Sequence, residues 1–326
     1  MRVASGPVNL LVTGGAGFIG SNYVRHVLAT TDDVVTVYDL LTYAGNKANL
    51  AEFEGDARYR FVQGDICDRD AVEQAMAGHD AVVHFAAESH VDRSIISPDE
   101  FVRTNCGGTN VVCDVARRLD VDRVLHISTD EVYGSVETGS SKESDPLDPR
   151  SPYSGSKAGS DLIALSYFST YGVPVMVTRS SNNFGPYQYP EKVIPLFVTN
   201  LLDGLKVPLY GDGMNVRDWC YVDDNVAAVD LVLREGEPGQ IYNIGGGNEV
   251  PNRVLVDRLL ALLDADESSV EYVVDRLGHD RRYSVDDAKI RALGWAPQRR
   301  LDEALAATVA WYRANRDWWS PLKAAP

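Results

Sequence analysis

The sequence is poor in cysteine and has no long apolar run. Its 326 residues include four cysteines, Cys67, Cys106, Cys113 and Cys220, and no two of them form a CxxC pair. Neither a disulfide framework nor a metal site with paired cysteines is therefore expected. No segment reaches the about 18 apolar residues of a membrane span, and the apolar run before the first glycines is too short for a signal peptide. These absences predict a reduced, cytoplasmic protein with no membrane partner and no bound metal.

Basic residues are also scarce. The chain has 31 Lys and Arg against 47 Asp and Glu, which gives a formal net charge of -16 at pH 7. Nucleic acids are bound by basic surfaces, so no nucleic-acid partner is expected. A nucleotide ligand remains possible, because it needs only a local basic pocket. The length fits one large or two smaller domains, and the 44% apolar fraction is that of a globular protein.

Short apolar runs alternate with amphipathic stretches through the first half of the chain. The pattern predicts strands at 8–13, 34–39, 59–63, 81–85, 123–128 and 175–179, and helices at 20–29, 70–76, 104–119 and 153–171. This alternation indicates parallel strands with right-handed crossovers. Beyond it, 180–194 has the composition of a loop, 240–244 of a strand, and 224–234, 253–263 and 301–315 of helices.

A glycine-rich turn joins the first predicted strand to the first predicted helix. Gly14, Gly17 and Gly20 are spaced GxxGxxG. Such glycines let the backbone approach a pyrophosphate, and the helix N-terminus adds free N–H groups. Asp39 ends the next strand, where a carboxylate can bind a ribose 2′-hydroxyl and repel a 2′-phosphate. The context favours NAD over NADP; the alternative is that Asp39 only caps a strand end.

Other strand ends point to the same place. Asp65 follows the third strand, and Ala86 and Ala87 follow the fourth. Ligands of open α/β sheets bind outside the carboxyl ends of the strands. We therefore predict an α/β fold, a Rossmann-type doubly wound parallel sheet with a smaller C-terminal substrate-binding lobe. The NAD-binding domain would comprise residues 1–184 with about 218–246, and the lobe residues 185–217 and 247–326.

Two groups of polar residues supply chemistry. Tyr153 and Lys157 lie at i and i+4 of a predicted helix, and an ammonium near a phenol should lower the pKa of the phenol, preparing it to take a proton. Thr129, Asp130 and Glu131 follow a predicted strand. Two adjacent carboxyls in a desolvated site should not both ionise, so one can serve as acid and one as base, as elimination of water requires. The alternatives are a solvated Tyr–Lys pair and a surface acid pair.

With these motifs in place, the chain resembles the dTDP-glucose 4,6-dehydratases of the extended short-chain dehydrogenase/reductase superfamily over nearly its whole length. The motifs that carry the resemblance are LVTGGAGFIGSN, DLLTYAGN, FVQGDICD, HFAAESHVDRSI, HISTDEVYGS, SPYSGSKAGSD, NNFGPYQYPEKVIP, PLYGDGMNVRDW and RLGHDRRYSVD. The Thr-Asp-Glu triad separates this group from sister nucleotide-sugar epimerases, which share the glycines and the Tyr–Lys pair.

The resemblance implies a role for each catalytic residue. Tyr153, supported by Lys157, takes the proton of the sugar 4-hydroxyl while carbon 4 gives hydride to NAD. Glu131 removes the carbon-5 proton, Asp130 protonates the leaving 6-hydroxyl, and the hydride returns to carbon 6. Thr129 holds the 4-hydroxyl. The cycle is redox-neutral, so NAD should stay bound.

The resemblance also implies binding residues. For the substrate, dTDP-glucose, they are Ser89, Thr129, Asp130, Glu131, Tyr153, Asn182, Lys192, Val193, Pro208, Tyr210, Arg217, Asn252, Arg276, His279 and Tyr283. For the cofactor they are Gly14, Gly17, Phe18, Ile19, Gly20, Asp39, Leu40, Thr42, Asp65, Ile66, Ala86, Ala87, Ser89, Thr104, Tyr153, Lys157 and Asn183. Arg217 and Lys192 suit a diphosphate chemically; the alternative is solvated surface charge.

Several points stay open at this level. A nucleotide-sugar 4-epimerase, a dehydratase of UDP- or CDP-glucose, and a binding protein without catalysis are alternatives. A homodimer is expected through the helices at 104–119 and 153–171, with Cys106 and Cys113 on a shared face. Gly155 and Gly159 interrupt the second of these helices; close backbone packing against the cofactor or a partner helix would explain them.

Overall fold

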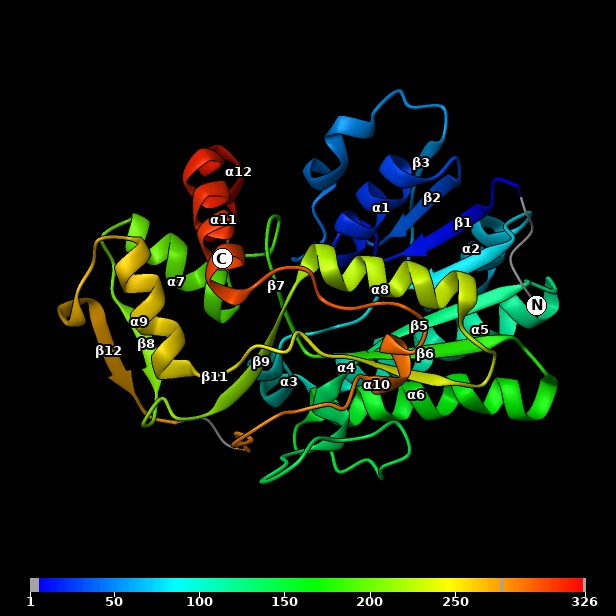
Figure 1. Cartoon of the computed structure of the whole chain (residues 1–326). Coiled ribbons are helices and arrows are strands. Elements are labelled where there is room, and N and C mark those ends of the chain that lie inside the picture. The colour runs from blue at the N-terminus through cyan, green and yellow to red at the C-terminus, as the bar shows by residue number, and fades with distance from the viewer. Residues whose placement is uncertain (1–5, 276–277, 325–326) are drawn as a thin grey trace.

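A seven-stranded parallel sheet forms the larger part of the molecule (Figure 1). The computed structural model describes residues 6–275 and 278–324. The strand order is β10-β6-β5-β4-β1-β2-β3, so the order reverses at β1. The strands are β1 (Asn9–Thr13), β2 (Val34–Asp39), β3 (Tyr59–Gln63), β4 (Ala81–His84), β5 (Arg123–Thr129), β6 (Val175–Ser180) and β10 (Ile241–Ile244). The predicted fold class is confirmed, and β10 returns to this sheet from late in the chain.

Helices cover both faces of the sheet because successive strand residues point to opposite sides. Leu10 and Val12 of β1 pack with α1 (Phe18–Thr30) and α8 (Val222–Glu235) in one hydrophobic cluster. Leu11, between them, belongs to another cluster, with the helices of the opposite face. Those helices are α2 (Arg69–Met76), α5 (Thr109–Arg118) and α6 (Pro152–Tyr171). Burial on both faces explains why the strand sequences are almost entirely apolar.

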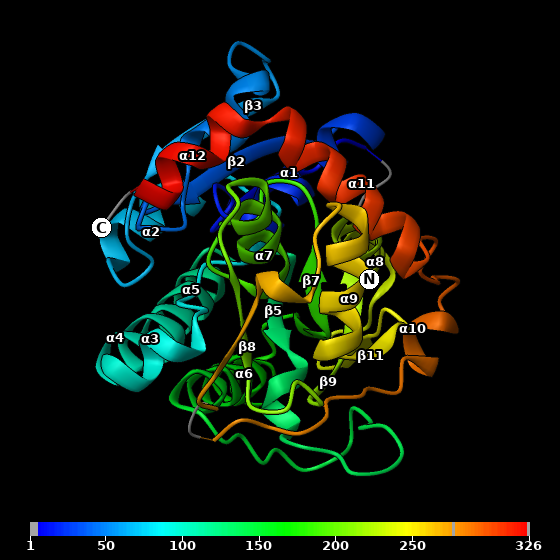
Figure 2. The same ribbon diagram turned by 90° about the vertical axis from the view of Figure 1, so that its left-hand side faces the viewer.

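The remaining elements form a smaller part with its own core (Figures 1 and 2). It holds a three-stranded sheet, a two-stranded parallel pair and four helices. These elements are β7 (Asn182–Phe184), β9 (Val216–Tyr221), β11 (Glu249–Pro251), β8 (Val207–Tyr210), β12 (Val270–Val273), α7 (Val193–Leu202), α9 (Asn252–Leu262), α11 (Leu301–Ala314) and α12 (Arg316–Ala324). The exact division into domains stays a prediction.

Short elements connect these layers. They are α3 (Val91–Ile96), α4 (Pro98–Phe101), α10 (Ala288–Arg291), η1 (Lys47–Phe53), η2 (Val102–Gly108), η3 (Asp130–Tyr133) and η4 (Glu267–Ser269). Of these, η2 is a π-helical segment, so the helix predicted at 104–119 is regular only from Thr109. The shared face of Cys106 and Cys113 is wrong for this reason. Cys113 is buried in the core, whereas the Cys106 thiol donates to the Ser156 carbonyl on α6.

The predicted loop at 180–194 is also partly wrong, because it contains β7 and the start of α7. The segment is polar because many of its residues line a cavity, which is described below.

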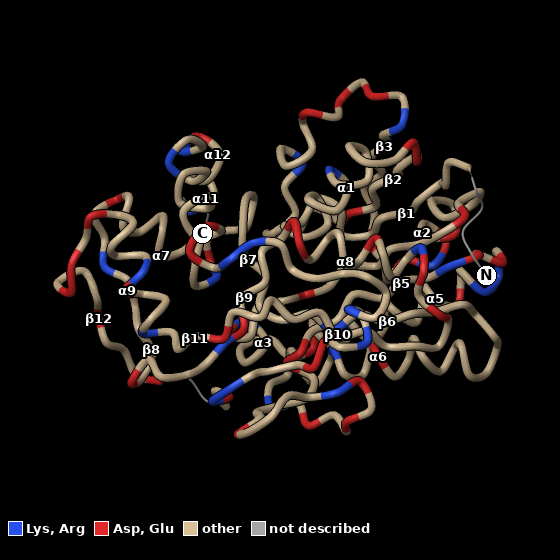
Figure 3. The backbone as a smooth tube through the Cα atoms, in the orientation of Figure 1, with Lys and Arg blue, Asp and Glu red and all other residues tan. Residues whose placement is uncertain are grey.

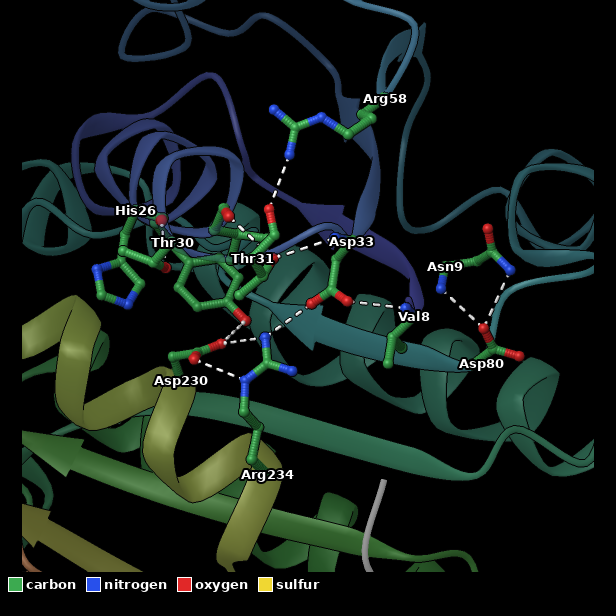
Figure 4. A network of polar contacts seen from close by, with 12 residues as sticks. Val8, Asn9, His26, Thr30, Thr31, Asp33, Arg58, Asp80, Asp230 and Arg234 are labelled. Atoms are coloured by element: carbon green, nitrogen blue, oxygen red, sulfur yellow. Dashed lines mark hydrogen bonds and ion pairs between the residues drawn. The ribbon is translucent and has the colours of Figure 1, made fainter. Parts of the chain in front are cut away.

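Charged residues are spread over both parts of the molecule (Figure 3). One network of buried carboxylates lies between α8 and the residue before β2, where Arg234 of α8 bridges Asp33 and Asp230 (Figure 4). Asp33 in turn accepts a hydrogen bond from the Val8 amide. This network ties α8 to the start of the sheet. No helix among the described residues is both long enough and apolar enough to cross a membrane.

Candidate active site

A cavity of about 490 Å³ opens at the carboxyl ends of the strands, between the sheet and the smaller part. Every predicted cofactor residue lines it, as do the five predicted catalytic residues. So do most of the predicted substrate residues, which are Ser89, Asn182, Lys192, Val193, Pro208, Tyr210, Arg217, Asn252 and His279. The fold thus brings together residues that are up to 265 positions apart, from Gly14 to His279.

The glycine turn at the start of α1 is shaped by three different constraints. Gly14 has a φ of 69°, and a Cβ there would lie 2.5 Å from the Ala86 nitrogen. A Cβ on Gly20 would lie 2.3 Å from the Gly14 carbonyl oxygen. Gly17 caps α1 with extended backbone. The turn therefore packs tightly against β4 and leaves the positive end of α1 facing the cavity, a cradle that fits a pyrophosphate.

Asp39 is held firmly at the end of β2. Its carboxylate accepts hydrogen bonds from the amides of Ala16 (3.0 Å) and Leu41 (2.8 Å). Burial raises the pKa of Asp39, and these two hydrogen bonds oppose the rise. The residue does cap the strand end, yet it also lines the cavity. Its position next to the glycine cradle fits an adenosine ribose, so the residues present fit NAD.

Helix α6 begins with a capping box. Ser151 and Ser154 exchange hydrogen bonds, and Pro152 occupies the first turn. This fixed start places Tyr153 and Lys157 in the cavity wall, both buried. Lys157 Nζ donates to the Ile127 carbonyl at 2.7 Å, which ties α6 to β5.

The pKa of Tyr153 differs from expectation. Burial raises it well above the usual range, the charge of Glu131 adds to the rise, and a hydrogen bond with Thr129 opposes it. The net shift is therefore opposite to the lowered pKa expected from the Tyr–Lys spacing, because desolvation of the phenol dominates. Burial also lowers the pKa of Lys157 to about 8.

The acid pair lies at the start of η3. The Thr129 side chain accepts a hydrogen bond from the Glu131 amide (3.2 Å) and lies 3.3 Å from an oxygen of Asp130. Asp130 is 3% exposed, and its Oδ2 has no hydrogen-bond partner among the described residues. Burial raises the pKa of Asp130 well above its usual range, and the charges of Glu131 and Asp218 raise it further. A protonated Asp130 beside Glu131 is the acid and base arrangement that elimination needs.

Three asparagines line the cavity with unused acceptors. Asn182, Asn183 and Asn252 each have a buried Oδ1 with no partner within the described part of the chain. Buried amide oxygens of folded proteins are nearly always hydrogen-bonded. These atoms are therefore available to the hydroxyl or N–H groups of bound molecules.

The two predicted basic residues are anchored differently. Lys192 Nζ donates to the Ser89 carbonyl at 2.6 Å, on the loop after β4. Arg217 is buried and donates to the Asp280 carbonyl (2.9 Å), with its guanidinium 4.2 Å from the centre of the Tyr283 ring. Tyr283 is not among the residues that line the cavity and lies against Arg217, so its contact with the substrate stays a prediction. Arg276 lies outside the described residues.

A set of side chains at the cavity mouth was missed. The Tyr43 hydroxyl donates to Glu191 (3.1 Å), and Arg93 lies over the Tyr43 ring at 3.6 Å. Arg93 Nε is also 3.5 Å from Glu191. Tyr43 and Glu191 lie in separate loops and Arg93 lies in α3, so no local pattern could connect the three residues. The only available signal was their presence in motifs already noted.

Comparison with known proteins agrees with this geometry. The model of the GDP-mannose 4,6 dehydratase family matches residues 11–308. The chain belongs to this family. It is 56% identical to a dTDP-glucose 4,6-dehydratase of Streptomyces antibioticus, over 98% of this chain and 96% of the relative. The resemblance noted from the sequence is thereby confirmed at the family level.

Solved structures extend the comparison. A dTDP-glucose 4,6-dehydratase from Streptomyces venezuelae, crystallised with NAD, is 57% identical with a TM-score of 0.95, covering 96% of this chain and 99% of that one. A UDP-glucose 4-epimerase of Thermus thermophilus, in complex with NAD, is 31% identical with a TM-score of 0.88, covering 94% and 99%. Members with different chemistry thus share this fold, so function must be argued from the site.

Proposed function

We propose that this chain is a dTDP-glucose 4,6-dehydratase (a hydro-lyase) that uses bound NAD and forms dTDP-4-keto-6-deoxyglucose. The observation that carries the proposal is the acid pair beside Tyr153, in which Asp130 is buried and Glu131 is half-buried. A 4-epimerase needs only a base and a hydride carrier, so Asp130 and Glu131 would have no role in its reaction. The identity to relatives named dTDP-glucose 4,6-dehydratases supports the same conclusion.

The roles of the residues follow from their protonation and position. Tyr153 acts as the base in its phenolate form, which the Lys157 ammonium one helical turn away stabilises, and it becomes a neutral phenol when it accepts the proton of the sugar 4-hydroxyl. The ketone made at carbon 4 acidifies the proton on carbon 5, which Glu131 removes. Asp130, held protonated by burial, donates its proton to the 6-hydroxyl as water leaves. Thr129 orients the oxygen on carbon 4.

The glycine cradle, Asp39 and Asn183 would hold NAD at the neighbouring end of the cavity. When bound there, NAD would supply the hydride acceptor for carbon 4 and, once reduced, the hydride donor for carbon 6. Arg217 and Lys192 would meet the diphosphate of the substrate, and Asn252 and His279 lie further along the same wall.

The test is mass spectrometry of the purified protein incubated with dTDP-glucose and no added NAD. We expect a product lighter by one water, which also requires that NAD co-purifies. An unchanged mass after NAD is added, with dTDP-galactose found on chromatography, would establish the epimerase instead. UDP- and CDP-glucose, tested in parallel, should give lower kcat/KM values if thymidine is preferred.

The acid pair can be tested separately. Glu131→Gln and Asp130→Asn should each lower kcat by on the order of 10²–10⁴, because each removes one proton transfer. Glu137→Gln, at an exposed position on the same segment, is the matched control and should retain full activity. Full dehydration by Glu131→Gln would remove the basis of the proposal.

Assembly and location form a second part of the proposal. The outer surfaces of η2 and α6 expose Val102 (55%), Leu162 (60%) and Tyr171 (59%), an apolar area suited to a homodimer. Light scattering should give the mass of two chains for the unmodified protein. For Leu162→Glu it should give the mass of a single chain. All four cysteines are free thiols, which supports a reducing compartment such as the cytoplasm.

A further inference from the structure

Helix α6 carries a third buried ionisable residue that the chemistry above does not use. Asp161 follows Lys157 by one turn, as Lys157 follows Tyr153, so the three share one helix face. Asp161 has no exposed surface. A carboxylate this deeply buried is costly unless it is paired, so its surroundings indicate its purpose.

Two neighbouring strands provide the partners of Asp161. Arg179 on β6 donates from Nε to Oδ2 at 2.9 Å. His126 on β5 places Nε2 at 3.3 Å from Oδ1. The Ser160 hydroxyl donates to the Lys157 carbonyl (2.8 Å) and lies 3.1 Å from His126 Nε2, so it must accept there, which assigns the proton of His126 to Nε2. Burial lowers the pKa of His126 to about 4, so the ring is neutral.

The arginine is anchored in turn. Arg179 Nη1 donates to the Tyr133 hydroxyl at 2.8 Å, and that hydroxyl donates to Asn243 Oδ1 at 2.9 Å. Burial opposes ionisation of Asp161, but the nearby His126 ring and the charges of Arg179 and Lys157 lower its pKa overall. Asp161 is therefore a fixed anion.

Lys157 faces groups from every element packed around it. Asp161 is on its own helix, Cys106 on η2, His84 on β4 and His126 on β5, and Arg179 of β6 is bonded to Asp161. Burial lowers the pKa of Lys157 and Asp161 is the largest opposing influence, followed by Cys106. Burial also raises the pKa of the Cys106 thiol, and burial lowers the pKa of His84, so both are neutral near pH 7. Asp161 is thus the fixed negative charge beneath the lysine.

We infer that Asp161, clamped by Arg179 and His126, is a positioning residue that keeps Lys157 protonated under Tyr153 during the reaction. The inference rests on the proposed role of Lys157. It assigns a function to a network that touches neither substrate nor cofactor.

The experiment compares pH profiles of kcat for the holoenzyme, Asp161→Asn and the charge-balanced Asp161→Asn/Arg179→Met, which removes the whole pair and so avoids an unpaired buried arginine. Loss of the anion lowers the pKa of Lys157, so the alkaline limb should move down by about one pH unit or more. Activity at pH 8 should then fall about fivefold or more, with little change at pH 6. Asp33→Asn, a buried carboxylate bonded to another arginine, is the matched control and should not move the limb.

A loss equal at every pH, or an unmoved limb in an active variant, would overturn the inference. A direct measurement follows the NMR signals of lysines labelled with 13C at Cε. The sequence has only seven lysines, and the signal that disappears in Lys157→Met is that of Lys157. The Lys157 signal should titrate at lower pH in either Asp161 variant. That reading holds even if the unmodified protein fails to dehydrate dTDP-glucose, which would count against the proposed function alone.

Discussion

Two networks in this protein pair buried carboxylates with arginine, but they differ in what surrounds them and in their proposed roles. One joins Asp161 to Arg179 beneath the cavity, and the other joins Arg234 to Asp33 and Asp230 between α8 and the start of β2. The Arg179 side chain is 2% exposed, whereas that of Arg234 is 27% exposed. Only the first network borders a group proposed to change its protonation state.

The difference shows that burial of charge does not by itself indicate function. Asp33 accepts hydrogen bonds from the Val8 amide and from Arg234, and both bonds stabilise the junction between a helix and the sheet. Asp161 satisfies no backbone amide, and its surroundings include a buried ammonium. Where an ion pair lies next to a reacting group, its field acts on chemistry as well as on stability.

The largest contrast should come from removing the arginines. Arg179→Leu leaves a fully buried carboxylate without its cation, and we expect a loss of about 3–5 kcal/mol in the free energy of unfolding. Arg234→Leu should cost about 1–3 kcal/mol, because water reaches that site. Urea unfolding followed by fluorescence measures both, and equal losses would erase the distinction between the networks.

A second contrast concerns pH. His126 is neutral in the folded protein down to pH about 4, whereas an unfolded histidine binds a proton below pH ~6.5. Unfolding therefore becomes easier as pH falls from 6.5 to 4, by up to about 3 kcal/mol from His126. His126→Gln should flatten this dependence in part, since His84 acts in the same direction.

A smaller effect is expected from Asp33→Asn. The Val8 amide and Arg234 donate to different oxygens of Asp33, and asparagine keeps only one acceptor. One of the two hydrogen bonds and the charge assistance are therefore lost, at a cost of about 2 kcal/mol. Activity of the folded fraction should not change. Thermal melting and steady-state kinetics on one preparation decide this, and a fall in kcat at unchanged melting temperature would contradict it.

The smallest effects concern the two glycines of α6. No atom lies within 4 Å of a Cβ built on Gly155, so Gly155→Ala should stabilise the protein by about 0.5–1 kcal/mol. A Cβ on Gly159 would lie 2.9 Å from Cys106 Sγ, so Gly159→Ala should destabilise it instead. Melting temperatures test both. Within this chain, Gly159 packs closely against Cys106, whereas packing of Gly155 against the cofactor or a partner helix stays a prediction.

Much of the sheet and cofactor cradle could be read from sequence because local rules determine them. The glycine spacing, the strand-end Asp39 and the Tyr–Lys pair each act within a few residues or one helical turn. The smaller part was harder, since β8, β9 and β12 gain their stability from a core that the sequence alone does not reveal.

Adjacent acid pairs show where sequence reasoning reaches its limit. Asp130 and Glu131 follow β5, and Asp223 and Asp224 follow β9 in the first turn of α8. Asp224 accepts a hydrogen bond from the Arg299 amide, which is a structural task. Asp130 instead keeps a buried oxygen without a partner among the described residues. The two pairs differ in surroundings brought from distant positions, which neither composition nor spacing records.

The late position of β10 in the chain also sets the order in which parts of the protein can fold during synthesis. Asn243 on this strand accepts the hydrogen bond of Tyr133, which holds Arg179. On the ribosome β6 emerges long before β10, because β7, β8, β9 and α8 lie between them in the chain. Until β10 docks, β6 is an open sheet edge and the charged pair beneath Lys157 is not closed off from water. A newborn chain should therefore acquire its cofactor cradle early and its lysine environment late.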